Sequence, residues 1–332
     1  GKISGAVDYF YRKRTGLLGN KWDVVTPAEL GYSLPQENVN SDAVLGGDGN
    51  IEYHGKKGDL NFVVGANFGF ARHRNLNSYK PRFNSQYNQY FNSGENRWAG
   101  TYWGYNCIGQ FQSQEEINNY TIDNDGQGNK TMLPGDLKYE DINKDGVIND
   151  DDVRPIGYAR DQNPTVNYGF NFSLQWKGFD LLADFSGGTM YSYNCNWEMR
   201  WPFQNTGALL KRLYDDRWHR QNIFDVNSAW VPGKYPALRW NEGGHSNYNK
   251  NSTFWLVNVR YLRARTLELG YTVPKNLTQK VGIEKARIYV NAYNLFSLDN
   301  LKDIGVEPEI MDENGLEYPQ NKFVNLGINL TF

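Results

Sequence analysis

Residues 168–186 read YGFNFSLQWKGFDLLADFS, and large apolar side chains occupy every second position of this stretch. On one side of Lys177-Gly178 the apolar residues alternate with Gly, Asn, Ser and Gln, and on the other side mostly with Asp and Ser. A two-residue period places one set of side chains on each face of a β-sheet. The stretch therefore predicts two strands, each with an apolar and a polar face, joined by a short connection.

The same alternation recurs along the chain. It appears in residues 2–12, 60–70, 287–293 and 324–332, and we expect further strands near residues 47–56 and 254–273. In the last of these, Leu262 and Ala264 have one parity and Leu267 and Leu269 the other, so a β-bulge near Arg265 would restore the facing. The pattern predicts eight strands.

Connection lengths favour a membrane barrel over a soluble sandwich. Short connections are expected at 55–58, 177–178 and 274–284, and they alternate with long ones at roughly 13–46, 71–167, 187–253 and 298–321. Outer-membrane barrels have short periplasmic turns and long exterior loops. The predicted fold class is all-β, a transmembrane antiparallel β-barrel whose C-terminus lies on the short-turn side. Small polar residues on the second face indicate a wide, wet lumen.

Composition excludes several classes of protein. The chain has 332 residues, 35 basic and 37 acidic side chains, 15% aromatic residues and a mean hydropathy of −0.71. No apolar run approaches the roughly 20 residues of a spanning helix, and no basic block suits nucleic acid. Cys107 and Cys195 are the only cysteines, and a disulfide or two unpaired thiols are equally compatible with their positions.

Several motifs, in a fixed order, resemble one family. They are Ile3 to Lys13, Gly135 to Tyr139, Arg154 to Gly157, Tyr168-Gly169-Phe170 with Lys177-Gly178-Phe179-Asp180, Asp216-Arg217-Trp218, Tyr261-Leu262-Arg263 through Leu269-Gly270-Tyr271, and Asn291 to Phe296 with the terminal Phe332. Together they resemble the SusC/RagA family of TonB-dependent outer-membrane transporters.

The resemblance implies a barrel of about 22 strands that contains an N-terminal plug, is capped by a SusD-like surface lipoprotein and is driven by TonB. It implies import of oligosaccharides or peptides across the outer membrane of a Gram-negative, Bacteroidetes-type bacterium. We expect residues 1–332 to be the C-terminal portion of the barrel, in contact with outer-membrane lipid, without the plug, the TonB-contacting segment and the earlier strands. Eight strands would not close such a barrel alone.

An acidic segment, residues 141–152, has the spacing of an EF-hand-type calcium loop. The expected ligands are the side chains of Asp141, Asn143, Asp145 and Asp152 and the backbone carbonyl of Val147. The glycine after Asp145 permits the sharp bend, whereas the closing Asp is shorter than the usual Glu. We expect a structural Ca²⁺, the alternative being a polar loop tip that needs no ion. The stretch 123–126 lacks downstream ligands and predicts a turn.

Aromatic side chains crowd the long loops. The candidate substrate contacts are Trp98, Tyr102, Trp103, Trp197 and Trp201. Sugar rings present C–H faces that stack on such rings. Alternatively, these residues form small cores within the loops or contact the lipoprotein.

Nothing in the sequence indicates catalysis. The four histidines are scattered singly, and no nucleophile with its base is apparent. The alternative function is that of a secreted calcium-binding carbohydrate-binding or glycoside-hydrolase β-module, which predicts no segregation of loop lengths. A siderophore receptor would share the barrel, but the order of the motifs and the implied lid argue against it.

Overall fold

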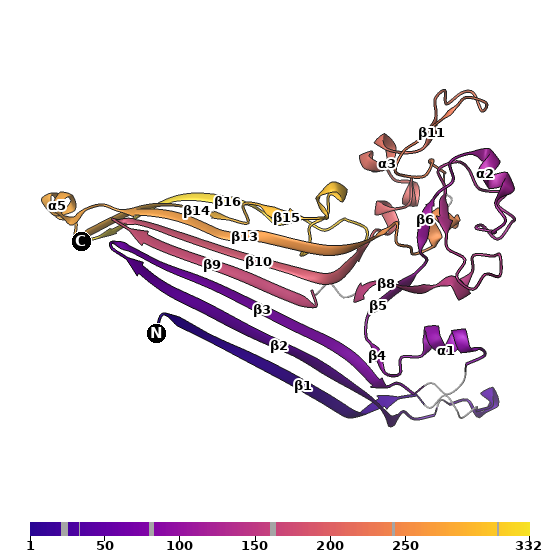
Figure 1. Ribbon diagram of the computed structural model, residues 1–332, viewed down its shortest axis with the longest axis horizontal. Helices are drawn as coiled ribbons and strands as arrows, with labels where there is room; N and C mark the ends of the chain where they lie inside the picture. The colour runs from indigo at the N-terminus through magenta and orange to yellow at the C-terminus, as the bar shows by residue number, and fades with distance from the viewer. Residues whose placement is uncertain (21–25, 33, 80–82, 160–163, 241–242, 311) are drawn as a thin grey trace.

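The computed structural model describes residues 1–20, 26–32, 34–79, 83–159, 164–240, 243–310 and 312–332. Its main element is one antiparallel sheet in which eight strands follow the order β1-β2-β3-β9-β10-β13-β14-β16 (Figure 1). The strands are β1 (Ile3–Gly19), β2 (Glu37–Lys57), β3 (Leu60–Asn77), β9 (Val166–Trp176), β10 (Phe179–Asn194), β13 (Leu256–Thr272), β14 (Lys285–Tyr293) and β16 (Phe323–Thr331). Two short strands, β4 (Arg97–Trp98) and β15 (Ser297–Asp299), pair with β3 and β13. We call the eight long strands the wall.

One row of paired residues crosses all eight strands of the wall. It consists of Ile3, Tyr53, Val64, Phe172, Ala183, Leu267, Ala292 and Val324. Every member is apolar or aromatic, and we call this face of the wall the apolar face. A row on the opposite face contains Asn50, Asn67, Gly169, Ser186 and Arg263. The eight predicted strands and their two-sided patterning are therefore confirmed.

The predicted bulge in β13 is also confirmed. Asp184 pairs with Thr266, and the next residue of β10, Phe185, pairs with Ala264. Arg265 is therefore the extra residue. Leu262 and Leu267 are five positions apart, so in a regular strand their side chains would lie on opposite faces. The extra residue Arg265 shifts the pairing by one position and places both leucines on the same face.

The short connections and the C-terminus lie at one end of the wall, as expected (Figure 1). Lys177 and Gly178 form a two-residue hairpin turn with φ angles of 47° and 90°, the left-handed conformation that such turns require. The third connection contains α5 (Lys275–Thr278) and η5 (Gln279–Val281).

Several predicted boundaries were wrong. β2 begins at Glu37 rather than near 47 and ends at Lys57, so its turn is Gly58-Asp59 and not 55–58. β3 and β10 likewise continue into stretches expected as loops. A strand that continues with polar residues on both faces no longer alternates, so the alternation ends before the strand does.

The long connections gather at the opposite end (Figure 1), where they contain many short elements. These are η1 (Ala28–Leu30), α1 (Gln86–Asn92), β5 (Thr101–Gly104), β6 (Cys107–Gln110), α2 (Gln114–Asn119), β7 (Leu137–Tyr139), η2 (Asp150–Asp152), β8 (Arg154–Ala159), η3 (Trp197–Met199), η4 (Gln204–Thr206), α3 (Lys211–Asp215), β11 (His219–Arg220), β12 (Trp230–Val231), α4 (Ser246–Asn249) and η6 (Lys302–Ile304). The pairs β5–β8, β6–β7 and β11–β12 form three small antiparallel sheets.

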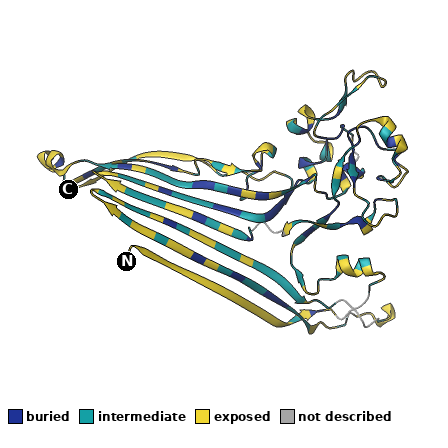
Figure 2. Cartoon of the chain, in the orientation of Figure 1, coloured by how far each residue is buried: buried dark blue, intermediate teal, exposed yellow. Residues whose placement is uncertain are grey.

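We call the described residues of 83–159, 195–255 and 300–320 the loop assembly. Much of the burial in the chain lies at this end, while strand surfaces toward the turns are more exposed (Figure 2). Its core includes Leu137, Tyr139, Leu213 and Trp255, each at most 2% exposed. Within the described part of the chain, none of the helices has the length and apolar character to cross a membrane.

Candidate functional site

The acidic loop 141–152 is held in shape by its own side chains. Asp141 accepts hydrogen bonds from the N–H groups of Lys144 (2.7 Å) and Gly146 (2.9 Å). Asp152, which is fully buried, accepts from the N–H groups of Ile142 (2.8 Å) and Asn149 (2.9 Å). The closing carboxylate therefore ties the start of the loop to its end.

The middle of the loop is more open. Asp145 accepts from the N–H of Val147 (2.9 Å) and from the side-chain amides of Asn143 (2.9 Å) and Asn149 (3.1 Å). The amide hydrogen bond from Asn143 is the main cause that lowers the pKa of Asp145. This carboxylate is therefore ionised at neutral pH and lies at an exposed position.

Neighbouring segments fix the loop from outside. The N–H of Ile148 donates to the carbonyl of Asp123 (2.8 Å), and the N–H of Asp123 donates to the carbonyl of Gly146 (2.8 Å). The Tyr105 hydroxyl bonds Asp150 at 3.2 Å, and the ammonium group of Lys250 lies 4.2 Å from the centre of the Tyr105 ring. The loop is thus part of the packed loop assembly.

The spacing of oxygen-bearing side chains along 141–152 is that of a calcium loop. In the structure, however, the carboxylates accept hydrogen bonds from backbone and side-chain amide groups. Among the described residues, no three or more His, Cys, Asp or Glu side chains are grouped as metal ligands. The ion therefore remains a prediction.

The second acidic stretch is a turn, as predicted. Asp123 accepts from the N–H groups of Gly126 (2.8 Å) and Gln127 (3.2 Å), and Asp125 bonds the hydroxyl of Thr131 at 2.7 Å. Sequence reasoning missed that this turn packs on the calcium-type loop through Asp123, because a backbone pairing leaves no mark on residue type.

The first group of candidate aromatic residues consists of Trp98, Tyr102 and Trp103, and it lies in a small cluster of aromatic rings and arginines. Arg72 stacks on Trp98 at 4.3 Å from the ring centre, and Trp103 packs edge-on against Phe91 at 5.1 Å. Tyr102 is only 5% exposed. Burial leaves little of the Tyr102 ring for a ligand, so for this residue the structure favours the alternative of a small core.

The second group is more accessible. Trp197 is 46% exposed, and its ring lies 5.0 Å from that of Trp201 at an interplanar angle of 59°. The indole N–H of Trp201 donates to the carbonyl of Tyr248 (2.8 Å). Trp197 has a φ of 47°, which for a bulky residue costs on the order of 1–3 kcal/mol and persists only where neighbours enforce it. This pair, in which Trp197 is exposed and has a strained backbone, is the better candidate contact.

A buried charge cluster was not predicted. Arg263 on β13, with a side chain only 4% exposed, pairs with Glu307 and Glu309, and Glu309 also pairs with Arg265. The hydroxyl of Tyr261 bonds Glu309 at 3.0 Å. The only sequence signal is the presence of charged residues in a strand and in a loop more than 40 positions away, which does not indicate pairing.

The two cysteines are free thiols. Cys195 is buried beside Met199 and Leu213, and burial raises the pKa of its thiol. Cys107 is partly exposed, and burial also raises the pKa of its thiol. Of the two arrangements that the sequence left open, the structure has the unpaired one.

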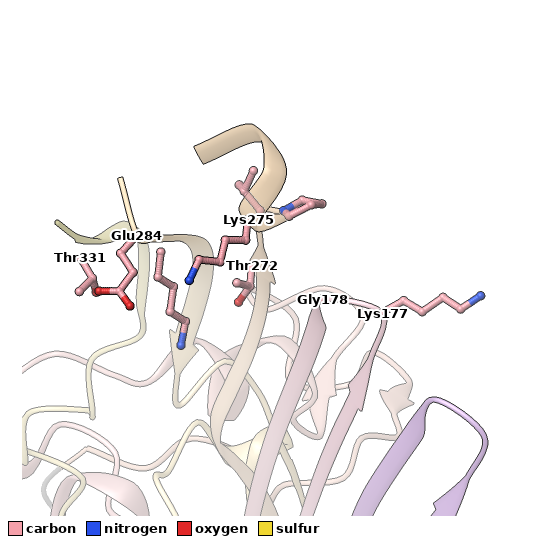
Figure 3. Close-up of a pocket in the computed structure, with 9 residues that line it drawn as sticks. Lys177, Gly178, Thr272, Lys275, Glu284 and Thr331 are labelled. Carbon is pink, nitrogen blue, oxygen red and sulfur yellow. The ribbon is translucent and has the colours of Figure 1, made fainter. Parts of the chain in front are cut away.

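A hollow of about 620 Å³ lies at the turn end of the wall, far from these residues. Lys177, Thr272, Lys275, Glu284 and Thr331 are among its lining residues, and in Figure 3 the side chain of Lys177 points away from the others. None of the sequence-predicted contacts lines it. The candidate site is therefore confined to the loop assembly.

Sequence comparison finds relatives that span the chain. A TonB-dependent receptor of Formosa agariphila is 26% identical over 364 residues, covering 100% of this chain and 33% of the relative. A second TonB-dependent receptor of the same organism is 24% identical and covers 68% of this chain and 22% of that relative. No family model matches the sequence. The chain thus spans about a third of the length of the first of these relatives.

Solved structures show the same fold. The RagAB peptide transporter matches all of this chain and 33% of the solved chain, with a TM-score of 0.64 and 22% identity. The RagAB peptide importer in its closed-closed state matches with a TM-score of 0.63 and 21% identity. These proteins are described as receptors, transporters and importers rather than enzymes, in agreement with the expectation that this chain is not an enzyme. The resemblance to TonB-dependent transporters of the SusC/RagA type is therefore confirmed, and the chain has the fold of about one third of such a protein.

Proposed function

We propose that this chain is the C-terminal part of the barrel of an outer-membrane transporter that imports oligosaccharides or peptides. The observation that carries the proposal is the apolar row that crosses all eight strands without interruption. Val7 and Leu326 on this face are 77% and 78% exposed. A soluble protein has little reason to expose so wide an apolar face, whereas lipid would cover it.

The partners follow from the same proposal. A plug and earlier strands would complete the barrel, TonB would drive transport through the plug, and a SusD-like lipoprotein would cover the loop assembly. The comparisons support a transport role, since the matching proteins are TonB-dependent receptors and a peptide importer. Lipid would contact the apolar face, and substrate would pass along the polar one.

Substrate contact is proposed for the loop assembly. Trp197 and Trp201 are the best placed of the candidate residues, because their rings are paired and the first is exposed. Trp98 and Trp103 would contribute partly covered rings, and Tyr102 would act mainly as a support. Exposed indole rings suit the C–H faces of sugars as well as apolar peptide side chains.

Cell fractionation tests the transport proposal. We expect the native protein in the outer membrane, with faster migration on a denaturing gel before heating than after it, and with a lipoprotein that co-purifies. A soluble protein whose migration does not change on heating would contradict the proposal and favour a secreted module. Uptake of a labelled oligosaccharide and of a labelled peptide by the same cells separates the two substrate classes.

We also propose a structural Ca²⁺ in the loop 141–152. Asp141, Asn143, Asp145 and Asp152 would hold it with their side chains, and Val147 with its backbone carbonyl. Supporting observations are the buried closing carboxylate and the ionised Asp145. Crowded carboxylates repel one another without a cation, so the ion would stabilise the loop and would take no part in chemistry.

Limited proteolysis tests the calcium proposal. Trypsin should cut after Lys144 faster once calcium is chelated, and added Ca²⁺ should restore protection where Mg²⁺ does not. Asp145→Asn should remove this response, whereas the control Asp303→Asn, an exposed acid in another loop, should keep it. Cleavage that does not respond to chelation would contradict the site.

A further inference from the structure

The segment that follows β10 is held by another segment far along the chain. The N–H of Asn196 donates to the carbonyl of Glu313 (2.9 Å), and its side-chain amide donates to the Glu313 carboxylate (3.1 Å). Arg200 in turn donates to the side-chain oxygen of Asn196 (2.9 Å). These bonds surround Trp197, whose left-handed backbone needs such enforcement.

Glu313 belongs to a loop that is itself fixed to the wall. We call residues 300–310 and 312–320 the last loop. The hydroxyl groups of Tyr191 and Tyr193 on β10 donate to the carbonyls of Pro308 (2.7 Å) and Asp312 (2.9 Å). Both tyrosines are at most 1% exposed. The last loop is therefore fixed to the wall at Pro308 and Asp312.

The charge cluster anchors the same loop on β13. Arg263 is 3% exposed and pairs with Glu307 and Glu309 of the last loop, and Gln320 donates to Glu309 at 3.1 Å. A buried arginine that loses its carboxylates is strongly unfavourable. Detaching the last loop would leave this charge without its partners, so the anchor is firm.

A close approach joins the last loop to the segment under the aromatic pair. Gly315 has a φ of 71°, and a Cβ atom there would lie 2.6 Å from the sulfur of Met199. Met199 is 5% exposed and packs with Cys195 in the core. Any other residue would strain this backbone angle and would require the Met199 side chain to move.

We infer that the last loop is a brace that fixes the pair of the exposed Trp197 and the partly buried Trp201, with Glu313 as its positioning residue and the charge cluster as its anchor. The inference rests on the proposed function only in taking this pair as a substrate contact. The brace explains why Trp197 keeps a strained backbone at an exposed position. Its segment is bonded to the last loop, and the last loop is bonded to the wall.

The chain contains a native reporter for the brace. Cys195 is 3% exposed and directly precedes Asn196, so loosening of this segment would expose its thiol. In full-length transporter carrying Cys107→Ser, with any cysteine outside residues 1–332 also replaced by Ser, the rate of maleimide labelling measures that exposure. Glu313→Ala removes the carboxylate, Glu313→Gln keeps an oxygen acceptor for Asn196, and the pair Glu307→Gln with Glu309→Gln removes the anchor charges.

We expect Glu313→Ala to raise the labelling rate of Cys195 about tenfold, the order of effect of one lost hydrogen bond, and Glu313→Gln to restore most of the protection. The anchor variant should raise labelling at least as much. Glu317→Gln, an exposed position of the same loop, should leave the rate unchanged. Unchanged labelling in Glu313→Ala and in the anchor variant would overturn the inference, as would an equal rise in Glu317→Gln.

Uptake by the same variants separates the brace from the proposed function. If Cys195 becomes reactive in Glu313→Ala while uptake of labelled oligosaccharide and peptide is unchanged, the brace stands and the aromatic pair is not a substrate contact. If both respond together, and Glu313→Gln rescues both, the brace positions a working contact.

Discussion

The wall and the loop assembly place their apolar side chains in opposite ways. Leu326 on the wall is 78% exposed, whereas Leu213 in the loop assembly is 2% exposed. A buried ring of the loop assembly, Tyr139, has a partner for its polar atom: its hydroxyl donates to the carbonyl of Ser246 (2.8 Å). The wall thus exposes apolar side chains on one face, and the loop assembly buries them in a core, as water-soluble domains do. Under the proposed function this difference arises because lipid surrounds the wall and water surrounds the loop assembly.

The largest expected effect is loss of a buried charge in the loop assembly. Asp136 is fully buried, pairs with Arg239, and accepts from the Asn247 amide (2.7 Å). Asp136→Ala would leave that arginine without this carboxylate and should lower the unfolding free energy of the loop assembly by about 3–5 kcal/mol. Proteolysis in increasing urea measures it. The exposed pair of Lys211 and Asp215 provides the control, since Asp215→Ala should cost less than about 1 kcal/mol; equal losses would refute this prediction.

A matched pair of leucines sharpens the comparison. Leu213→Ala should lower the unfolding free energy of the loop assembly by about 2–5 kcal/mol, because it leaves a cavity in a packed core. Leu326 lies on the exposed face of β16. Leu326→Ala should therefore change the unfolding free energy of the loop assembly by less than about 0.5 kcal/mol. The urea-dependent proteolysis above measures both variants. A similar loss in the two would mean that the wall and the loop assembly unfold as one unit.

The smallest effect is a pH dependence within the loop assembly. Burial alone would raise the pKa of Asp125, but hydrogen bonds from the Thr131 hydroxyl and from the N–H groups of Thr131 and Gln127 outweigh it and lower the pKa to about 2. A folded-state pKa below the unfolded value stabilises the fold above the unfolded pKa near 4, and this stabilisation is lost as pH falls toward 2. Protection of Lys130 from acid-tolerant proteases should therefore decline between about pH 4 and pH 2.

Asp125→Asn tests the cause of that decline. The amide cannot titrate, so protection of Lys130 should be lower at neutral pH and should change less on acidification. If the decline in acid is as steep in the variant as in the original protein, another carboxylate is responsible.

The wall could be read from the sequence because its strands carry apolar side chains on one face and mostly polar ones on the other, which gives a period of two. The bulge at Arg265 was visible for the same reason, since the parity of apolar residues changes within a strand where one extra residue is inserted. Strand ends were misplaced where the alternation stops before the strand does. At Glu37 to Gly46, for example, nothing distinguishes a solvated strand from a loop.

The loop assembly could be predicted only in its local motifs. The order of donors in 141–152 predicted a calcium loop, and in the structure Asp141 and Asp152 accept backbone hydrogen bonds within this segment; the ion itself stays a prediction. The strand pair of Cys107–Gln110 with Leu137–Tyr139 joins segments that carry no common pattern. The contact of Glu313 with Asn196 is also invisible in the sequence, because one acid and one amide, 117 positions apart, do not indicate each other.

Spin labels placed one at a time along residues 324–330, in full-length protein with both native cysteines replaced, test most directly whether the wall faces lipid. In outer membranes, collision with oxygen, which is enriched in lipid, should be high at Val324, Leu326, Ile328 and Leu330, and collision with a water-soluble nickel complex should be high at the positions between them. This alternation is the predicted result. Collision frequencies without a period of two, or nickel contact highest at the four apolar positions, would contradict the account.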